Sequence, residues 1–213
     1  MLKFGRRVGM LGVCALALAG CVTAQNTIQP TDSEGRRAYL RYAGSDSPVY
    51  LRAANPPTEL GDHDAVASVM ANAASGAVFA MPTTFTSEIG AANHPNFRIV
   101  ALFDPEESLS TADVCESEAR AADVAAARYS DRTNLFLAFC TRGEALGGTK
   151  VSGPKITSLS DPALAKMTRA GIQEMFAVDA RDRRRGEPPV LGSISGNPSN
   201  FGFRLNPLEG VIN

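Results

Sequence analysis

Two apolar segments constrain the fold of this chain more than any other feature. Residues 96–103 read Asn-Phe-Arg-Ile-Val-Ala-Leu-Phe, and residues 133–140 read Thr-Asn-Leu-Phe-Leu-Ala-Phe-Cys. Both have the length and the content of β-branched and aromatic residues that are typical of strands, and Asp104-Pro105 ends the first one. Their continuous apolar ends indicate burial on both faces. We therefore expect both segments to be central strands of a sheet.

Weaker patterns predict the remaining elements. Between Asp62, a helix N-cap, and Gly76, a C-terminal cap, Val66 and Met70 belong to one apolar helical face. From 38–42 and 49–53 we expect a hairpin, or one strand that follows an irregular lead-in. In chain order we then expect a helix over 63–75, an extended segment over 77–81 and 83–86, a short helix around 116–127, an edge strand over 145–151 that Gly147 and Gly148 weaken, and a last helix from Pro162 to about Val178.

This order predicts an α+β fold with a mostly antiparallel sheet and about two helices packed on one face. Hydrophobic residues make up 44% of the chain and charged residues 20%, which excludes wholesale disorder. We assign residues 36–178 to a single domain. Residues 179–213 form a charged linker followed by a tail rich in Gly, Asn, Ser and Pro, in which we expect little regular structure.

The N-terminal residues have the pattern of a signal peptide. Residues 1–7 carry three basic side chains and no acidic one, and residues 8–24 carry no charge. Leu18-Ala19-Gly20-Cys21 resembles the lipobox of bacterial lipoproteins at every position. The resemblance implies that residues 1–20 are a signal peptide cleaved before Cys21, with a diacylglycerol on the sulfur and an acyl chain on the new amine. The alternative is a plain secretory signal in which Cys21 is incidental.

The lipobox resemblance also implies a location. Several acyl chains hold a protein stably on a bilayer, whereas one gives only marginal binding. Val22 follows the cysteine, and Asp at that position is typical of lipoproteins kept in the inner membrane. We therefore expect a cell-envelope protein on the outer membrane, facing the periplasm, with polar residues 21–35 as a flexible tether. The formal net charge of −1 gives no basic field for a nucleic acid partner.

The four cysteines divide into three groups. The lipobox resemblance implies that Cys14 leaves with the signal peptide and that Cys21 carries the lipid. Cys115 and Cys140 remain in an oxidising compartment, which predicts one disulfide between them. The alternative is a thiol pair with a catalytic or metal-binding role, but neither cysteine has a His or Asp at ligand spacing. We expect no metal and no cofactor.

The body of the chain resembles an uncharacterised family of Gram-negative envelope lipoproteins over about residues 38–178. The similarity lies in the Leu-Phe-Asp-Pro strand end, the cysteine in the next loop, the Ala-Phe-Cys strand end and the final helix. It implies a fold and no activity.

No pattern predicts a catalytic residue. His63 between two aspartates and His94 in a loop are the two candidate imidazole ligands, and Ser152 with Lys155 fits a Ser-x-x-Lys spacing without its companion motifs. The favoured interpretation is a non-enzymatic binding or assembly role with an envelope protein as partner. The alternatives are a small envelope hydrolase acting on cell-wall or lipid substrates, and a periplasmic binder of a small ligand.

Overall fold

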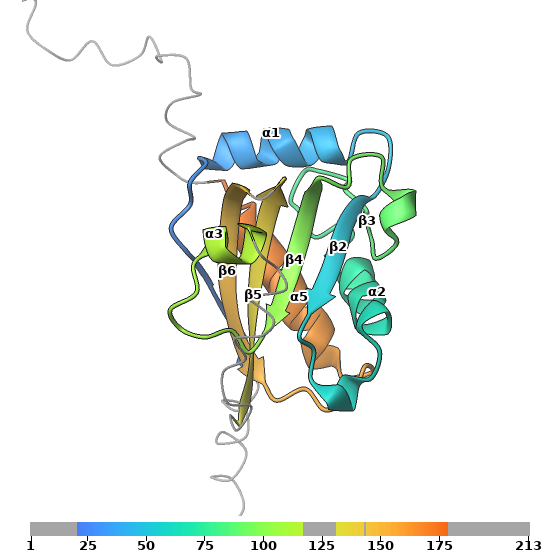
Figure 1. Cartoon of the computed structure of the whole chain (residues 1–213), viewed down its shortest axis with the longest axis vertical. Helices are drawn as coiled ribbons and strands as arrows, with labels where there is room; N and C mark the ends of the chain where they lie inside the picture. The colour runs from blue at the N-terminus through green and yellow to red at the C-terminus, as the bar shows by residue number, and fades with distance from the viewer. Residues whose placement is uncertain (1–20, 117–130, 143, 179–213) are drawn as a thin grey trace, which may run out of the picture.

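A computed structural model describes residues 21–116, 131–142 and 144–178 as an α+β domain (Figure 1). The elements in chain order are β1 (Thr23–Asn26), α1 (Ser33–Ala43), β2 (Val49–Ala54), a 3₁₀ turn (Thr58–Leu60), α2 (His63–Ala74), β3 (Phe85–Thr86), a second 3₁₀ turn (Ile89–Ala91), β4 (Phe97–Phe103), α3 (Thr111–Glu116), β5 (Arg132–Thr141), β6 (Glu144–Pro154) and α5 (Pro162–Met175).

The strands form one sheet in the order β1-β6-β5-β4-β2-β3. The pairs β1–β6, β6–β5 and β5–β4 are antiparallel, whereas β2 runs parallel to both β4 and β3. The sheet is therefore mixed, where the sequence predicted a mostly antiparallel one. The parallel pairs arise because the chain crosses over through α2 between β2 and β3, which a hairpin connection does not allow.

The two faces of the sheet bury separate cores. On β5, Leu135, Leu137 and Phe139 join the core beneath α2 and α5, while Phe136 and Ala138 join the core beneath α3. This alternation is what a strand buried on both faces requires. The predicted pair of helices on one face is confirmed as α2 and α5 (Figure 1). The helix α3 covers part of the other face, and α1 lies across one end of the sheet.

Residues 38–42 were predicted as a strand of a hairpin, and this prediction is wrong because they lie in α1. Asp32 caps this helix by accepting a hydrogen bond from the Gly35 backbone N at 2.7 Å. Its buried residues are Ser33, Arg36, Leu40 and Ala43, which recur with a helical period. The helical period is recognisable only when the sequence is read from the N-cap Asp32, because residues 38–42 alone contain too few of its positions.

The flexible tether predicted over 21–35 is also wrong. Residues 23–26 form β1, which pairs with β6 from Thr23↔Ser152 to Asn26↔Thr149, and α1 begins at Ser33. The domain therefore starts near Thr23 and not near Arg36. The segment is short and polar because it is an exposed edge strand, and such a strand has little apolar signal.

The remaining predictions differ in outcome. The predicted strands 96–103 and 133–140 are confirmed as β4 and β5, and the helices over 63–75 and from Pro162 as α2 and α5. Residues 77–81 form no strand, and only Phe85–Thr86 of 83–86 does. The edge strand predicted over 145–151 is the interior strand β6. Most of the 116–127 helix and all of the 179–213 tail lie outside the described residues.

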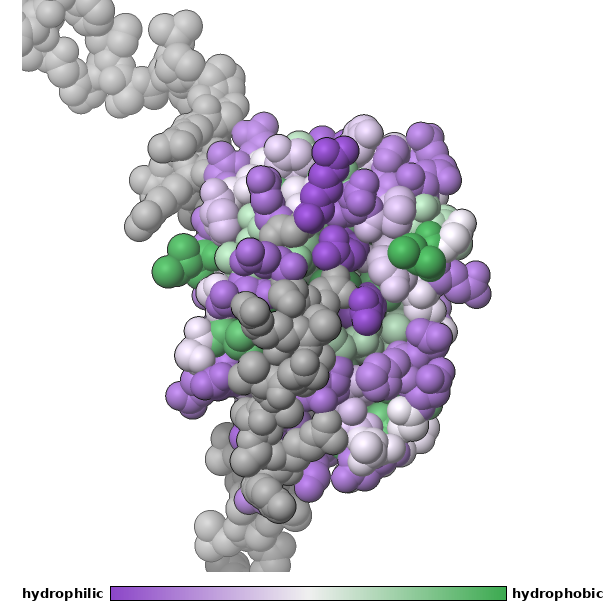
Figure 2. Space-filling view, viewed as in Figure 1, coloured by the Kyte–Doolittle hydropathy of each residue, from purple (hydrophilic) through white to green (hydrophobic). Residues whose placement is uncertain are grey.

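The surface seen in Figure 2 is mostly hydrophilic, with small separated hydrophobic areas. Three exposed large apolar side chains of the described residues, Ile28, Phe79 and Ile89, come from distant parts of the chain, whereas the exposed Tyr39 and Tyr42 both belong to α1. Single exposed apolar residues of this kind need no binding partner to explain them. Among the helices of residues 21–116, 131–142 and 144–178, none has the length and hydropathy that crossing a bilayer requires.

Candidate functional site

Cys21 stands at one end of the sheet. It is exposed, it has a free thiol, and β1 begins only two residues later at Thr23. The Nη2 of Arg132, the first residue of β5, donates to the Cys21 backbone O at 3.2 Å. Arg132 in turn pairs with Pro154, the last residue of β6. We call the end of the sheet marked by Cys21, Arg132 and Pro154 the anchor end, after the lipid attachment that the sequence predicts at Cys21.

The segment after Cys21 is fastened along β6 by side chains as well as by strand pairing. Thr27 donates to the Gly148 backbone O through both its N and its Oγ1, each at 3.0 Å. Gln29 donates from Nε2 to the same carbonyl at 2.6 Å and accepts from the Gly148 N at 3.1 Å. Asn26 reaches α5 by donating to Glu174 Oε1 at 2.9 Å. The chain from residue 23 to 29 is therefore an integral part of the domain.

The opposite end of the sheet is covered by α1, and we call it the α1 end. Thr141 and Phe97 are paired there, at the end of β5 and the start of β4. Arg36, with 2% of its surface exposed, donates from Nε to the Met175 O at 3.0 Å. Arg37 donates to the Phe176 O at 3.0 Å. These bonds place the C-terminus of α5 at the α1 end, where guanidinium groups neutralise the partial negative charge of its last carbonyls.

Four aromatic rings meet at the α1 end. The Tyr39 ring stacks on Phe97 with 5.8 Å between centroids, and the Tyr42 ring lies 5.5 Å from Phe97 and 4.5 Å from His94. They line a cleft of about 380 Å³ together with polar groups that include Arg142. We call Tyr39, Tyr42, His94 and Phe97 the aromatic surface. Exposed aromatic side chains with polar neighbours are typical of protein-binding surfaces.

The predicted disulfide between Cys115 and Cys140 is confirmed. The bond joins α3 to β5, with Cα atoms 5.4 Å apart, and both residues are buried. It ties the described part of α3 to the sheet. The alternative of a thiol pair with a catalytic or metal-binding role is not supported, because both sulfur atoms are used in the bond and lie away from solvent.

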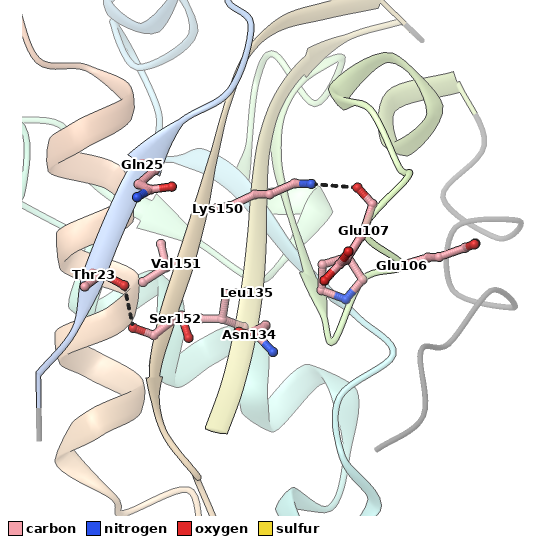
Figure 3. A pocket seen from close by; sticks show the side chains of 10 residues that line it. Thr23, Gln25, Glu106, Glu107, Asn134, Leu135, Lys150, Val151 and Ser152 are labelled. Carbon is pink, nitrogen blue, oxygen red and sulfur yellow. Dashed lines mark hydrogen bonds between the residues drawn. The ribbon is translucent and has the colours of Figure 1, made fainter. Parts of the chain in front are cut away.

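A shallow cleft of about 250 Å³ lies beside β1, on the face of the sheet that carries α3 (Figure 3). Thr23 and Gln25 of β1, Lys150 and Ser152 of β6, and the loop residues 105–107 line it. Lys150 Nζ donates to the Glu107 O at 3.1 Å and lies 5.3 Å from the centre of the Phe136 ring. The Lys150 ammonium group therefore holds the loop at Glu107. Lys150 also lines a second, more apolar cleft of about 380 Å³ beside Thr27 and Leu109.

The structure keeps the candidate catalytic residues apart. His63 opens α2 next to the anchor end, whereas His94 lies against Tyr42 at the α1 end. Ser152 Oγ accepts from Arg132 Nε at 3.0 Å and lines the cleft beside β1, while Lys155 lines a different one. Among the residues that the structure describes, no three potential metal ligands lie together. The Ser-x-x-Lys spacing falls at the end of a strand and not at the start of a helix.

Comparison with known proteins gives this chain no family. No family model matches it, and no curated protein does. Among solved structures, it is similar to a PelC dodecamer from Paraburkholderia phytofirmans, with 12% sequence identity, a TM-score of 0.38, and coverage of 72% of this chain and 98% of that chain.

Proposed function

We propose that this chain is a lipid-anchored lipoprotein of the cell envelope, held on the outer membrane through Cys21 and facing the periplasm, with a non-enzymatic binding or assembly role. The observation that carries the proposal is the Leu18-Ala19-Gly20-Cys21 sequence after a basic and then apolar stretch. A lipidated cysteine must be accessible to the enzymes that modify and cleave the precursor, and Cys21 is exposed.

The position of the fold relative to the cleavage point supports the proposal. The first described strand begins at Thr23, with only Val22 between it and Cys21. A signal peptide is absent from the mature protein, so the elements of a lipoprotein domain must lie after the cleavage point. Cleavage before Cys21 would leave every described element in the mature chain.

The arrangement of the polar residues favours binding over hydrolysis. A hydrolase needs a nucleophile, a base and an oxyanion site within a few ångströms of one another. Ser152 and Lys155 line separate clefts, and His63 and His94 lie towards opposite ends of the sheet. The aromatic surface, by contrast, is a ready contact area for a protein partner.

The proposal is tested by cross-linking the anchored protein in cells and identifying what is joined to it. We expect one envelope protein to be recovered in near-stoichiometric amount from the wild type and to be lost in Cys21→Ser, whose chain cannot carry the lipid. A matched variant, Tyr42→Ser, alters the aromatic surface and leaves the anchor intact. Recovery of the lipidated protein alone would contradict the binding role.

A further inference from the structure

We propose that the lipid on Cys21 fixes the orientation of the domain, with the anchor end of the sheet against the bilayer surface and the α1 end directed away from it. The inference rests on the proposed lipidation of Cys21. It goes beyond anchoring because a lipoprotein on a flexible tether has no preferred face towards the membrane. It names the bilayer as the partner of one particular end of this sheet.

The connection between lipid and domain is too short to act as a tether. Only Val22 separates Cys21 from β1, and two residues of extended chain span at most about 7 Å. The Cys21 carbonyl is itself bound by Arg132, so even this short piece is held to the first residue of β5. Thr23 adds a bond from its Oγ1 to the Ser152 O at 3.4 Å.

The domain is long compared with that connection. The paired strands β5 and β6 run from Arg132↔Pro154 at the anchor end to Thr141↔Glu144 at the α1 end. Ten residues of strand span about 33 Å. A connection of about 7 Å cannot let the far end of a sheet of this length reach the bilayer surface without tilting the whole domain.

The anchor end carries side chains of both charges, so electrostatic attraction to the bilayer does not determine how the domain is oriented. Lys155 is exposed there, and so are Glu59 and Asp62 around the first 3₁₀ turn and the start of α2. An anionic bilayer attracts clusters of basic residues, and these three side chains form no such cluster. The covalent attachment and its short connection therefore set which end meets the membrane.

The consequence lies at the other end of the molecule. The aromatic surface lies beside α1, and the described chain ends at Val178, just after the α5 C-terminus that Arg36 and Arg37 hold. Both are on the side that points into the periplasm. A periplasmic partner can then reach the aromatic surface without approaching the lipid.

The test uses the full lipidated protein in vesicles that contain phospholipids with a nitroxide on the acyl chain near the headgroup. Two variants each add one thiol, Thr157→Cys next to the anchor end and Ala38→Cys on α1, and both positions are exposed. In the lipidated protein the Cys21 sulfur is in a thioether and the other two cysteines form the disulfide. A fluorescent maleimide therefore labels only the added thiol.

We expect the nitroxide lipids to quench the dye at Thr157→Cys strongly and to leave the dye at Ala38→Cys at its intensity in unlabelled vesicles. A matched control inserts a Gly-Ser spacer of about 12 residues between Val22 and Thr23, which has a root-mean-square reach of about 20 Å. The spacer should remove most of the difference between the two positions.

Two outcomes overturn the inference. Equal quenching at both positions, or a difference that the spacer leaves unchanged, would show that the short connection does not orient the domain. Intact mass measured on the same samples separates this from failure of the proposed function. A protein without the lipid on Cys21 contradicts both statements, whereas a lipidated protein with equal quenching contradicts the orientation alone.

Discussion

At the scale of single residues, Gln29 extends the sheet with its side chain. Its amide group donates to the Gly148 O and accepts from the Gly148 N, which is the pairing that a strand backbone would make. The sequence offers no signal for this role, because a Gln between Ile28 and Pro30 looks like part of a polar connection. Only the partner glycine, 119 residues away, makes Gln29 structural.

Gln29→Glu is expected to lower the free energy of unfolding by about 1–3 kcal/mol. The substitution keeps the shape but replaces the Nε2 donor with an oxygen that faces the Gly148 carbonyl, 2.6 Å from the present nitrogen. Urea denaturation of the chain without lipid, from residue 22 to 213, measures the effect. The same change at the exposed Gln25 should cost less than about 0.5 kcal/mol, and equal losses at the two positions would refute the pairing role.

Gly148 itself is expected to tolerate no side chain. A Cβ there would lie 2.6 Å from Thr111 Oγ1 and 2.9 Å from the Phe136 ring, so Gly148→Ala should cost about 1–3 kcal/mol through overpacking. Gly90→Ala is the matched control, because a Cβ at that position meets nothing within 4 Å. The urea midpoints of the two variants give the comparison, and an unchanged midpoint for Gly148→Ala would contradict the close packing.

These glycines show why β6 was misplaced by sequence reasoning. Gly147 and Gly148 weaken a strand by propensity, which favoured an edge position. In the structure they are needed in the interior, because Gln29 and Arg36 pack against Gly147 while Thr111 and Phe136 pack against Gly148. Contacts between residues so distant in sequence leave no local pattern.

At the scale of elements, α1 and α5 are joined through a buried cation. Arg36 lies within α1 and donates to the carbonyls of Thr31 and Met175, so one side chain ties the entry to α1 to the end of α5. Arg36 is among the largest fully buried side chains of the described domain. A buried charge is tolerated only when such bonds satisfy it.

Arg36→Met is therefore expected to lower the free energy of unfolding by about 3 kcal/mol, because two carbonyls lose a charged donor. Arg41→Met, on the exposed part of the same helix, should cost less than about 0.5 kcal/mol. Urea denaturation of both variants measures the difference. Similar small losses in the two variants would refute the role of Arg36 in joining the helices.

The disulfide ties α3 to the sheet, and its contribution is separable from packing. The bond closes a loop with a sequence separation of 25, which on the chain-entropy model stabilises the fold by about 3.5 kcal/mol. Cys115→Ala combined with Cys140→Ala should lower the free energy of unfolding by about that amount, as measured in urea. Reduced wild-type protein is the control, and a double variant as stable as the oxidised protein would contradict this account.

The sequence predicted elements best where one segment carried its own pattern. Strands β4 and β5 are continuous apolar runs, and α5 shows its cap at Asp161 followed by Pro162. Sequence-based prediction was wrong for β1 because this exposed strand is held in place by its pairing with β6. The prediction for α1 was wrong because its Tyr-Leu-Arg-Tyr sequence has a local β propensity that tertiary packing overrides. The aromatic surface was missed for the same reason, as Tyr39 and Tyr42 share a face only on a helix.

At the scale of the whole molecule, the two ends of the domain carry different features. One carries the exposed cysteine that follows the lipobox-like sequence, and the other carries the aromatic surface and the exit of the chain after Val178. The disulfide that the cysteine positions predicted is confirmed, whereas the lipid anchor at Cys21 stays a prediction. The sequence did not predict that Cys21 adjoins the first strand, since that depends on the pairing of β1 with β6.

The most direct test of the account is the intact mass of the protein purified from membranes of a bacterial host that processes lipoproteins. We predict a chain that begins at Cys21 and carries the added mass of a diacylglycerol and an acyl chain, less the mass of the two hydrogen atoms that the Cys115–Cys140 disulfide removes. Cys21→Ser should yield an unmodified precursor. A wild-type protein cleaved at another residue, or cleaved before Cys21 without lipid, would contradict the central claim.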